Sequence, residues 1–191
     1  MNIVKKDWKE YLKDNNFFDY LIADPPWRFD DKPPKVDGQL SYSLWDDNKK
    51  CLNEMFDNAK SKHYLIWIPT SLLPDLISVV AKRDDLDFKT LLTWVKTTSK
   101  GKIHYGLGHT LRNSTEQLAF VSSKGNKPMR LNIRNVYHGK TKPRTGKPRE
   151  LEKILVSNID LEKNKKGVYL FSGSEDLDIF MDFNIDLVDI I

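Results

Sequence analysis

Short apolar runs of strand length alternate along this chain with segments of helical periodicity. The runs cover residues 17–23, 63–68, 88–95, 117–122, 167–171 and 185–191, and β-branched and aromatic side chains are frequent in them. Helical spacing of apolar residues marks 46–59, 71–82, 149–158 and 175–182, with Thr70 or Ser71 as the expected N-cap of the second segment. Nearly continuous apolar strands are typical of parallel sheets that are covered on both faces. We therefore expect an α/β fold with a mainly parallel sheet, helices on both faces, and one domain over residues 1–191.

Positive charge is concentrated in one part of the chain. Residues 96–149 hold 13 Lys and Arg against one acid, Glu116, so they carry +12 of a net charge of +4 and leave −8 for the remainder. This segment includes an expected loop at 96–113 and an irregular stretch at 132–148; a further loop is expected at 28–44. The asymmetry favours contact with phosphates, and a solvated basic face that binds nothing is the alternative.

Several classes of protein are excluded by what the sequence lacks. The single cysteine, Cys51, excludes an internal disulfide and a cysteine-cluster metal site. The four histidines, at 63, 104, 109 and 138, lack ligand spacing, so we expect no metal. The N-terminus is charged, and no apolar stretch approaches about 18 residues, so we expect no signal peptide, no membrane span and a cytoplasmic location.

The motif with chemical meaning is Asp24-Pro25-Pro26-Trp27, directly after the first apolar run. An aromatic amine is a poor nucleophile because its lone pair is delocalised into the ring. A carboxylate and a proline-flanked carbonyl can accept its two hydrogens and direct the lone pair at a methyl donor, which is catalysis by orientation and electrostatics. The prolines keep the loop rigid, and Trp27 offers a face for a base. The alternative is a rigid turn with Trp27 as a core residue.

Further motifs follow in a fixed order after this loop. They are Leu65-Ile66-Trp67-Ile68, Trp94-Val95-Lys96-Thr97, Gly106-Leu107-Gly108, Arg112-Asn113 with Glu116, Lys124-Gly125, Lys147-Pro148 and Leu170-Phe171. Over about residues 18–171 the chain resembles the DPPW-type adenine-N6 methyltransferases, the family named for the seventy-kilodalton subunit of the mRNA adenosine methyltransferase. The resemblance implies a Rossmann-like sheet with permuted motif order, in which the catalytic loop precedes the cofactor-binding strand, and S-adenosyl-L-methionine as cofactor.

The resemblance also implies roles for individual residues. Asp24, Pro25, Pro26 and Trp27 would be catalytic, with Asp24 also contacting the methionine end of the cofactor. Lys147 would pair with the cofactor carboxylate, and its position before a helix N-terminus suits that role. The other implied cofactor contacts are Asp7, Phe171, Gly173 and Ser174, and the implied substrate contacts are Trp27, Lys96, Arg112, Asn113 and Glu116.

Some of these residues have simpler interpretations. Lys147 can be a surface lysine, and Glu116 can form a salt bridge with Arg112 at i, i+4. Trp67 and Trp94 lie inside apolar strands and are expected to be core residues.

The C-terminal part departs from the family. An Arg and an Asn that hold the cofactor ribose are replaced by Gly173 and Asp176. The run also resembles the Phe-x-Gly-Ser turn of other amino-methyltransferases, in which an acid after the next strand holds the ribose. Asp186 or Asp189 would be that acid.

Three functions follow from these features. The first is adenine-N6 methylation of DNA, which a compact chain of bacterial or phage type favours. The second is methylation of RNA by the same residues. The third is a non-catalytic nucleic-acid-binding subunit with a lost cofactor site. A homodimer and a hetero-oligomer are both open.

Overall fold

The computed structural model describes residues 2–5, 7–15, 17–29, 44–106, 108, 110–141, 146–159, 165–171 and 183–189. Its strands are β1 (Asn2–Lys5), β2 (Phe17–Ala23), β3 (Lys60–Ile68), β4 (Leu86–Thr97), β5 (Thr115–Ser123), β6 (Val136–Lys140), β7 (Gly167–Leu170) and β8 (Ile185–Asp189). Its helices are α1 (Trp8–Asp14), α2 (Asn48–Asn58), the short 3-10 helix η1 (Thr70–Leu72), α3 (Leu73–Ala81) and α4 (Arg149–Ile159). The expected helix at 175–182 lies outside the described residues.

The described strands form one sheet in the order β1-β8-β7-β2-β3-β5-β4-β6. β5 runs antiparallel to β3 and β4, and the remaining neighbours pair in parallel. The prediction of a mainly parallel sheet is therefore confirmed. The first and last described strands, β1 and β8, pair at one edge. That pairing supports the expected single domain, which stays a prediction.

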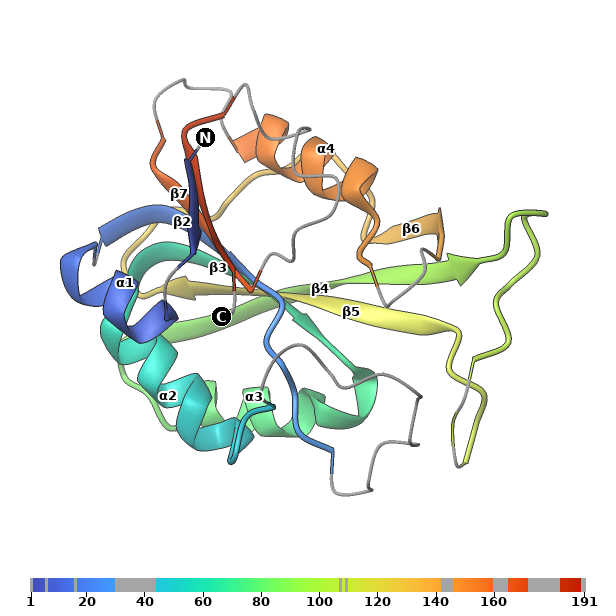
Figure 1. The fold of residues 1–191 in the computed structure, drawn as a ribbon, viewed down its shortest axis with the longest axis horizontal. Coiled ribbons are helices and arrows are strands. Elements are labelled where there is room, and N and C mark those ends of the chain that lie inside the picture. Colours follow the sequence, from blue (N-terminus) through green and yellow to red (C-terminus); the bar gives the residue numbers. More distant parts are fainter. Residues whose placement is uncertain are drawn as a thin grey trace.

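Helices cover both faces of this sheet, as predicted (Figure 1). One apolar core joins the sheet to α1, α2 and α3 through side chains such as Leu12, Met55 and Leu76. The other lies under α4, whose Leu151 and Leu155 pack against the opposite face. No helix among the described residues is both long and apolar enough to span a membrane.

Three elements were not predicted from the sequence. β1 has four residues, too few for a recognisable alternation, and α1 is a seven-residue helix in a charged segment. β6 lies in the basic stretch expected to be irregular, and it forms because its backbone pairs with the edge of β4. The expected N-cap at Thr70 or Ser71 is wrong, because these residues lie within η1 and no side chain caps η1 or α3.

The topology creates a switch point between β7 and β2. From β2 the chain continues to β3 on one side, whereas from β7 it continues to β8 on the other. In open α/β sheets, ligands bind at the carboxyl ends of the strands at such a point. Ala23 of β2 pairs with Leu170 of β7, so the residues that follow them, Asp24 and Phe171, meet at this edge.

Candidate active site

The Asp24 side chain lies on the α4 face of the sheet at its carboxyl edge. Side chains alternate along a strand, and Tyr20 and Ile22, which precede Asp24 by four and two residues, belong to the core under α4. The Asp24 backbone N–H donates to the Leu170 carbonyl at 3.2 Å, which fixes the loop to β7. The side chain is 27% exposed, so the carboxyl group is largely shielded from solvent and still accessible to a ligand.

A buried lysine joins this carboxylate to a second one. Lys147 Nζ lies 2.9 Å from Asp24 Oδ1 and 2.6 Å from Glu116 Oε1. The other oxygen of Glu116 pairs with Lys96 Nζ at 2.8 Å. Two carboxylates and two ammonium groups therefore form one charge-balanced cluster from β2, β4, β5 and the segment before α4. Lys147 is 6% exposed, so it is not the surface lysine of the alternative interpretation.

The cluster sets the protonation of its members. Burial and the negative charge of Glu116 outweigh Lys147 and raise the pKa of Asp24 to about 6. Burial alone would raise the pKa of Glu116 too, but its two lysine partners outweigh burial and lower it. Burial would lower the pKa of Lys147, but the two carboxylates raise it, so the ammonium stays charged. At neutral pH Asp24 is an ionised acceptor close to the pH at which it takes up a proton.

A second buried network supports the lysine from behind. Lys147 Nζ lies 5.7 Å from the centroid of the Trp67 ring, and Trp67 Nε1 donates to Glu152 Oε1 at 2.8 Å. The same oxygen accepts from the Tyr169 hydroxyl at 2.5 Å, and Glu152 Oε2 accepts from Arg149 at 2.7 Å. Glu152 is fully buried. This network fixes the ring against which Lys147 rests.

The loop after Asp24 is rigid and closely packed. The Trp27 N–H donates to the Pro25 carbonyl at 2.8 Å, and the Trp45 N–H donates to the Pro26 carbonyl at 2.9 Å. A carbonyl oxygen has two lone pairs, so Pro25 keeps one for a ligand. Trp27 is 5% exposed, its Nε1 donates to the Trp67 carbonyl at 2.9 Å, and its ring meets Trp45 edge-on. In this arrangement Trp27 supports the loop, and stacking on a base stays a prediction.

The cofactor side of the site contains one uncompensated donor. Phe171 follows β7 with φ 62°, and its ring meets Trp45 edge-on at a centroid distance of 5.9 Å. Trp45 Nε1 is buried and has no hydrogen-bond partner in the described part of the chain. A buried N–H without a partner costs about 1–3 kcal/mol, so a bound ligand that accepts this bond would relieve it. A buried cation, a turn with positive φ and a free donor at one edge fit a cofactor with a carboxylate and polar groups.

Other predicted residues are distributed around the site. Asp7 is the N-cap of α1 and accepts from the backbone N–H groups of Lys9 and Glu10. Arg112 and Asn113 are exposed and lie just before the first residue of β5. Arg112 lies over the Tyr105 ring, and the described partners of Glu116 are the two lysines, so the alternative interpretation of an Arg112–Glu116 salt bridge is wrong. Gly173, Ser174 and Asp176 lie outside the described residues.

The register separates the two candidate ribose acids. Asp186 pairs with Val168, near the amino ends of β7 and β8, and its carboxylate accepts from the Tyr11 hydroxyl at 2.7 Å. Asp189 follows Val188, which pairs with Leu170, so its backbone is level with Phe171 at the carboxyl edge. Of the two candidates, the backbone of Asp189 lies nearer to this edge, and its role as the ribose acid stays a prediction.

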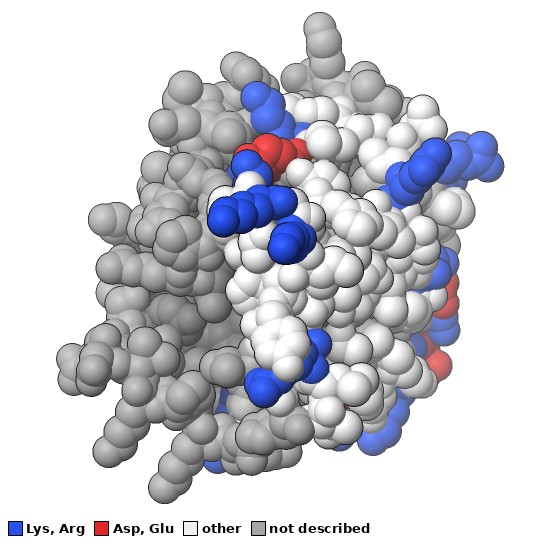
Figure 2. Space-filling model, turned by 90° about the vertical axis from the view of Figure 1, so that its right-hand side faces the viewer, with Lys and Arg blue, Asp and Glu red and all other residues white. Residues whose placement is uncertain are grey.

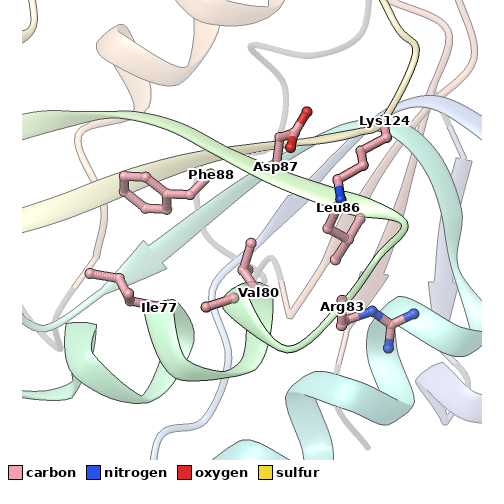
Figure 3. Close-up of a pocket in the computed structure, with 8 residues that line it drawn as sticks. Ile77, Val80, Arg83, Leu86, Asp87, Phe88 and Lys124 are labelled. Atoms are coloured by element: carbon pink, nitrogen blue, oxygen red, sulfur yellow. The ribbon is translucent and has the colours of Figure 1, made fainter.

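A cavity of about 280 Å³ lies elsewhere, between α3 and the start of β4 (Figure 3). Its lining includes Ile77, Val80, Arg83, Phe88 and Lys124. β4 begins at the sheet edge opposite Asp24, so this cavity is separate from the charged cluster. Within the described residues, no group of three His, Cys, Asp or Glu is arranged to hold a metal ion.

Sequence reasoning missed the network behind Lys147. Arg149 and Glu152 are three residues apart on a helix, a spacing that normally indicates an exposed pair, and nothing in the sequence connects them to Tyr169 or Trp67. Trp67 and Trp94 are buried as predicted, but the hydrogen bond from Trp67 to Glu152 gives Trp67 a polar role as well.

Comparisons with known proteins identify the fold and the family of the chain. The chain is similar to the crystal structure of the M1.HpyAVI-SAM complex, with a TM-score of 0.65 and 18% identity over 100% of this chain and 93% of that chain. A crystal structure of M1.HpyAVI gives a TM-score of 0.61 and 15% identity over 100% and 92%. A search of curated proteins finds no match. The MT-A70 family model matches residues 18–172. The chain therefore belongs to the MT-A70 family, as the sequence motifs predicted.

Proposed function

We propose that this protein is an S-adenosylmethionine-dependent methyltransferase that methylates the exocyclic N6 of adenine in DNA. The family match supports the class of enzyme that the motifs predict. The observation that carries the proposal is the cluster in which buried Lys147 joins Asp24 to Glu116 at the carboxyl edge of β2.

Lys147 would hold the cofactor. Its ammonium stays charged and lies two residues before α4, where positive charge favours a carboxylate. The methionine carboxylate would replace Asp24 as one of its partners, which frees Asp24 for the substrate. Phe171, the uncompensated N–H of Trp45 and the backbone near Asp189 would hold the rest of the cofactor.

When bound, S-adenosylmethionine would supply an electrophilic methyl group, whose bond to the sulfonium sulfur would break as the N–C bond forms and leave a neutral thioether. The Asp24 carboxylate accepts one hydrogen of the adenine amine, and the Pro25 carbonyl accepts the other. Both bonds direct the nitrogen lone pair toward the methyl group. The rigid Pro-Pro loop holds the two acceptors in place before the substrate binds. The amine loses a proton as the new N–C bond forms, and a carboxylate with a pKa of about 6 is suited to receive it.

DNA is the substrate that we propose, with the cytoplasm of a bacterium or a phage-infected cell as the compartment. The family match covers residues 18–172, and the excess of positive charge lies in residues 96–149, which include Lys96 and Lys147 of the charged cluster. A base in duplex DNA leaves the stack to enter such a site, at a cost of a few kcal/mol.

The test is transfer of labelled methyl from S-adenosylmethionine to matched DNA and RNA oligonucleotides. We expect transfer to DNA, none with Asp24→Ala, and unchanged transfer with the control Asp87→Ala, which lies at the opposite sheet edge. Transfer to RNA alone would overturn the DNA assignment. Absence of transfer to either, together with no cofactor binding by calorimetry, would identify a non-catalytic nucleic-acid-binding subunit.

A further inference from the structure

Residues 98–114 connect β4 to β5, and their described part (98–106, 108 and 110–114) forms a projection that we name the β4–β5 arm (Figure 1). Three large apolar side chains of the arm are exposed to solvent: Ile103 is 63% exposed, Tyr105 75% and Leu111 82%. The Arg112 guanidinium lies over the Tyr105 ring, 4.9 Å from its centroid. An exposed aromatic ring with a cation on one face leaves the opposite face free for a planar group.

The position of this pair is fixed by the backbone of the arm. The arm begins with a tight turn in which Gly101 has φ 76° and its N–H donates to the Thr98 carbonyl. Farther along, a Cβ on Gly106 would come within 2.2 Å of the Asn113 carbonyl oxygen, so the two segments of the arm touch where only glycine fits. Tyr105 and Arg112 are the neighbours of these two residues. The ring and the guanidinium are therefore held together before any ligand binds.

The root of the arm is part of the active site. The Lys96 carbonyl accepts from the His104 N–H, and the Lys96 N–H donates to the Ser114 carbonyl, both at 2.8 Å. The side chain of Lys96 is the partner of Glu116 in the charged cluster. A ligand on the arm would therefore lie beside the reacting base.

The charge of the arm indicates the kind of ligand. Residues 98–114 contain Lys100, Lys102 and Arg112 and no acid, and Lys140 of β6 pairs in register with Thr97 at the root. On the face shown in Figure 2, Lys and Arg side chains predominate over the few acids visible in its described part. A second copy of this chain would present the same positive charge, and like charges oppose association. Phosphates complement it.

We propose that Tyr105 and Arg112 form a stacking platform for an unpaired base that flanks the target adenine, with Lys100 and Lys102 on the adjacent phosphates. This proposal rests on the proposed function, since it names the part of the chain that holds the substrate strand. Stacking on an aromatic ring tolerates any base, so the platform contributes affinity and position without sequence preference.

The experiment measures the dissociation constant of a fluorescent adenine-containing oligonucleotide, single-stranded and duplex, by anisotropy. Tyr105→Ala should raise it roughly 10-fold, and Tyr105→Phe should stay near wild type, because the ring is what stacks. Phe17→Ala is the matched control: Phe17 is 55% exposed on β2, with Lys62 Nζ 5.8 Å from its ring centroid, at the opposite sheet edge. It should leave the dissociation constant unchanged. Lys100→Ala, which removes a proposed phosphate contact, should reduce the salt dependence of binding by about one unit of slope.

Three results would overturn the proposal. If Tyr105→Ala binds as tightly as wild type, the arm is not the platform, while the proposed function stands. If Tyr105→Ala leaves binding intact but converts an oligomer to a monomer in light scattering, the arm is a protein interface. If wild type binds no oligonucleotide, the platform and the proposed substrate both fail; calorimetry with S-adenosylmethionine then shows whether the cofactor site survives.

Discussion

Replacement of Glu152 by Leu tests the network that positions Lys147. The substitution removes a fully buried carboxylate to which the Arg149 guanidinium, 8% exposed, donates a hydrogen bond. Breaking a buried pair by removing one partner costs about 3–5 kcal/mol. The Trp67 N–H and the Tyr169 hydroxyl lose an acceptor in the same step, so the upper part of that range applies. For a chain of this size the loss lowers the melting temperature by roughly 10 °C or more.

Chemical denaturation measures this loss directly. Glu150→Leu, at an exposed position of the same helix, is the matched control and should change the free energy of unfolding by less than about 0.5 kcal/mol. The double variant Arg149→Met, Glu152→Leu should recover part of the loss, because it removes both charges of this buried pair together. If Glu152→Leu costs less than about 1 kcal/mol, the network is not stabilising and the support for Lys147 must be sought elsewhere.

Three further predictions concern the charged cluster. Lys147→Met should weaken S-adenosylmethionine binding about 10-fold or more, since a charge-assisted hydrogen bond is lost; an unchanged calorimetric dissociation constant would exclude Lys147 as the cofactor's partner. The rate constant kcat/KM should fall below about pH 6, because burial raises the pKa of Asp24 to about 6 and the protonated acid cannot accept the amine hydrogen; a profile flat to pH 4.5 would contradict this. Glu116→Gln should lower the free energy of unfolding at neutral pH. The difference from wild type should shrink as the pH falls through the lowered pKa of Glu116, because the ionised form is lost there. A difference in unfolding free energy that grows in acid would contradict this prediction.

The sequence predicted those elements whose apolar residues form a pattern that is visible along the chain itself. The apolar runs of β2, β3, β4 and β5 and the periodicity of α2 and α4 are local signals. β6 was missed because an edge strand in a basic segment forms only through pairing with β4. α1 was missed because a short helix in a charged segment gives little apolar periodicity, and Asp7, which the family resemblance suggested as a cofactor contact, is its N-cap.

The candidate site was predictable in part for a related reason. Asp24 could be identified because its loop follows a strand and carries an unusual motif, and Lys147 because it precedes a helix. Their direct contact at 2.9 Å, and the neutral cluster completed by Lys96 and Glu116, depend on which strands become neighbours. Spacing along the chain does not contain that information, which is why the expected Arg112–Glu116 pair was wrong.

In the mechanism that we propose, Asp24 orients an adenine amine beside a cofactor held by Lys147. Mass spectrometry of nucleosides from DNA that has been incubated with the pure protein and S-adenosylmethionine tests it most directly. We predict N6-methyladenine with wild type and none with Asp24→Asn. In that variant an amide donor replaces one acceptor, while cofactor binding persists. Equal N6-methyladenine from both proteins, or methylation at another atom, would contradict it.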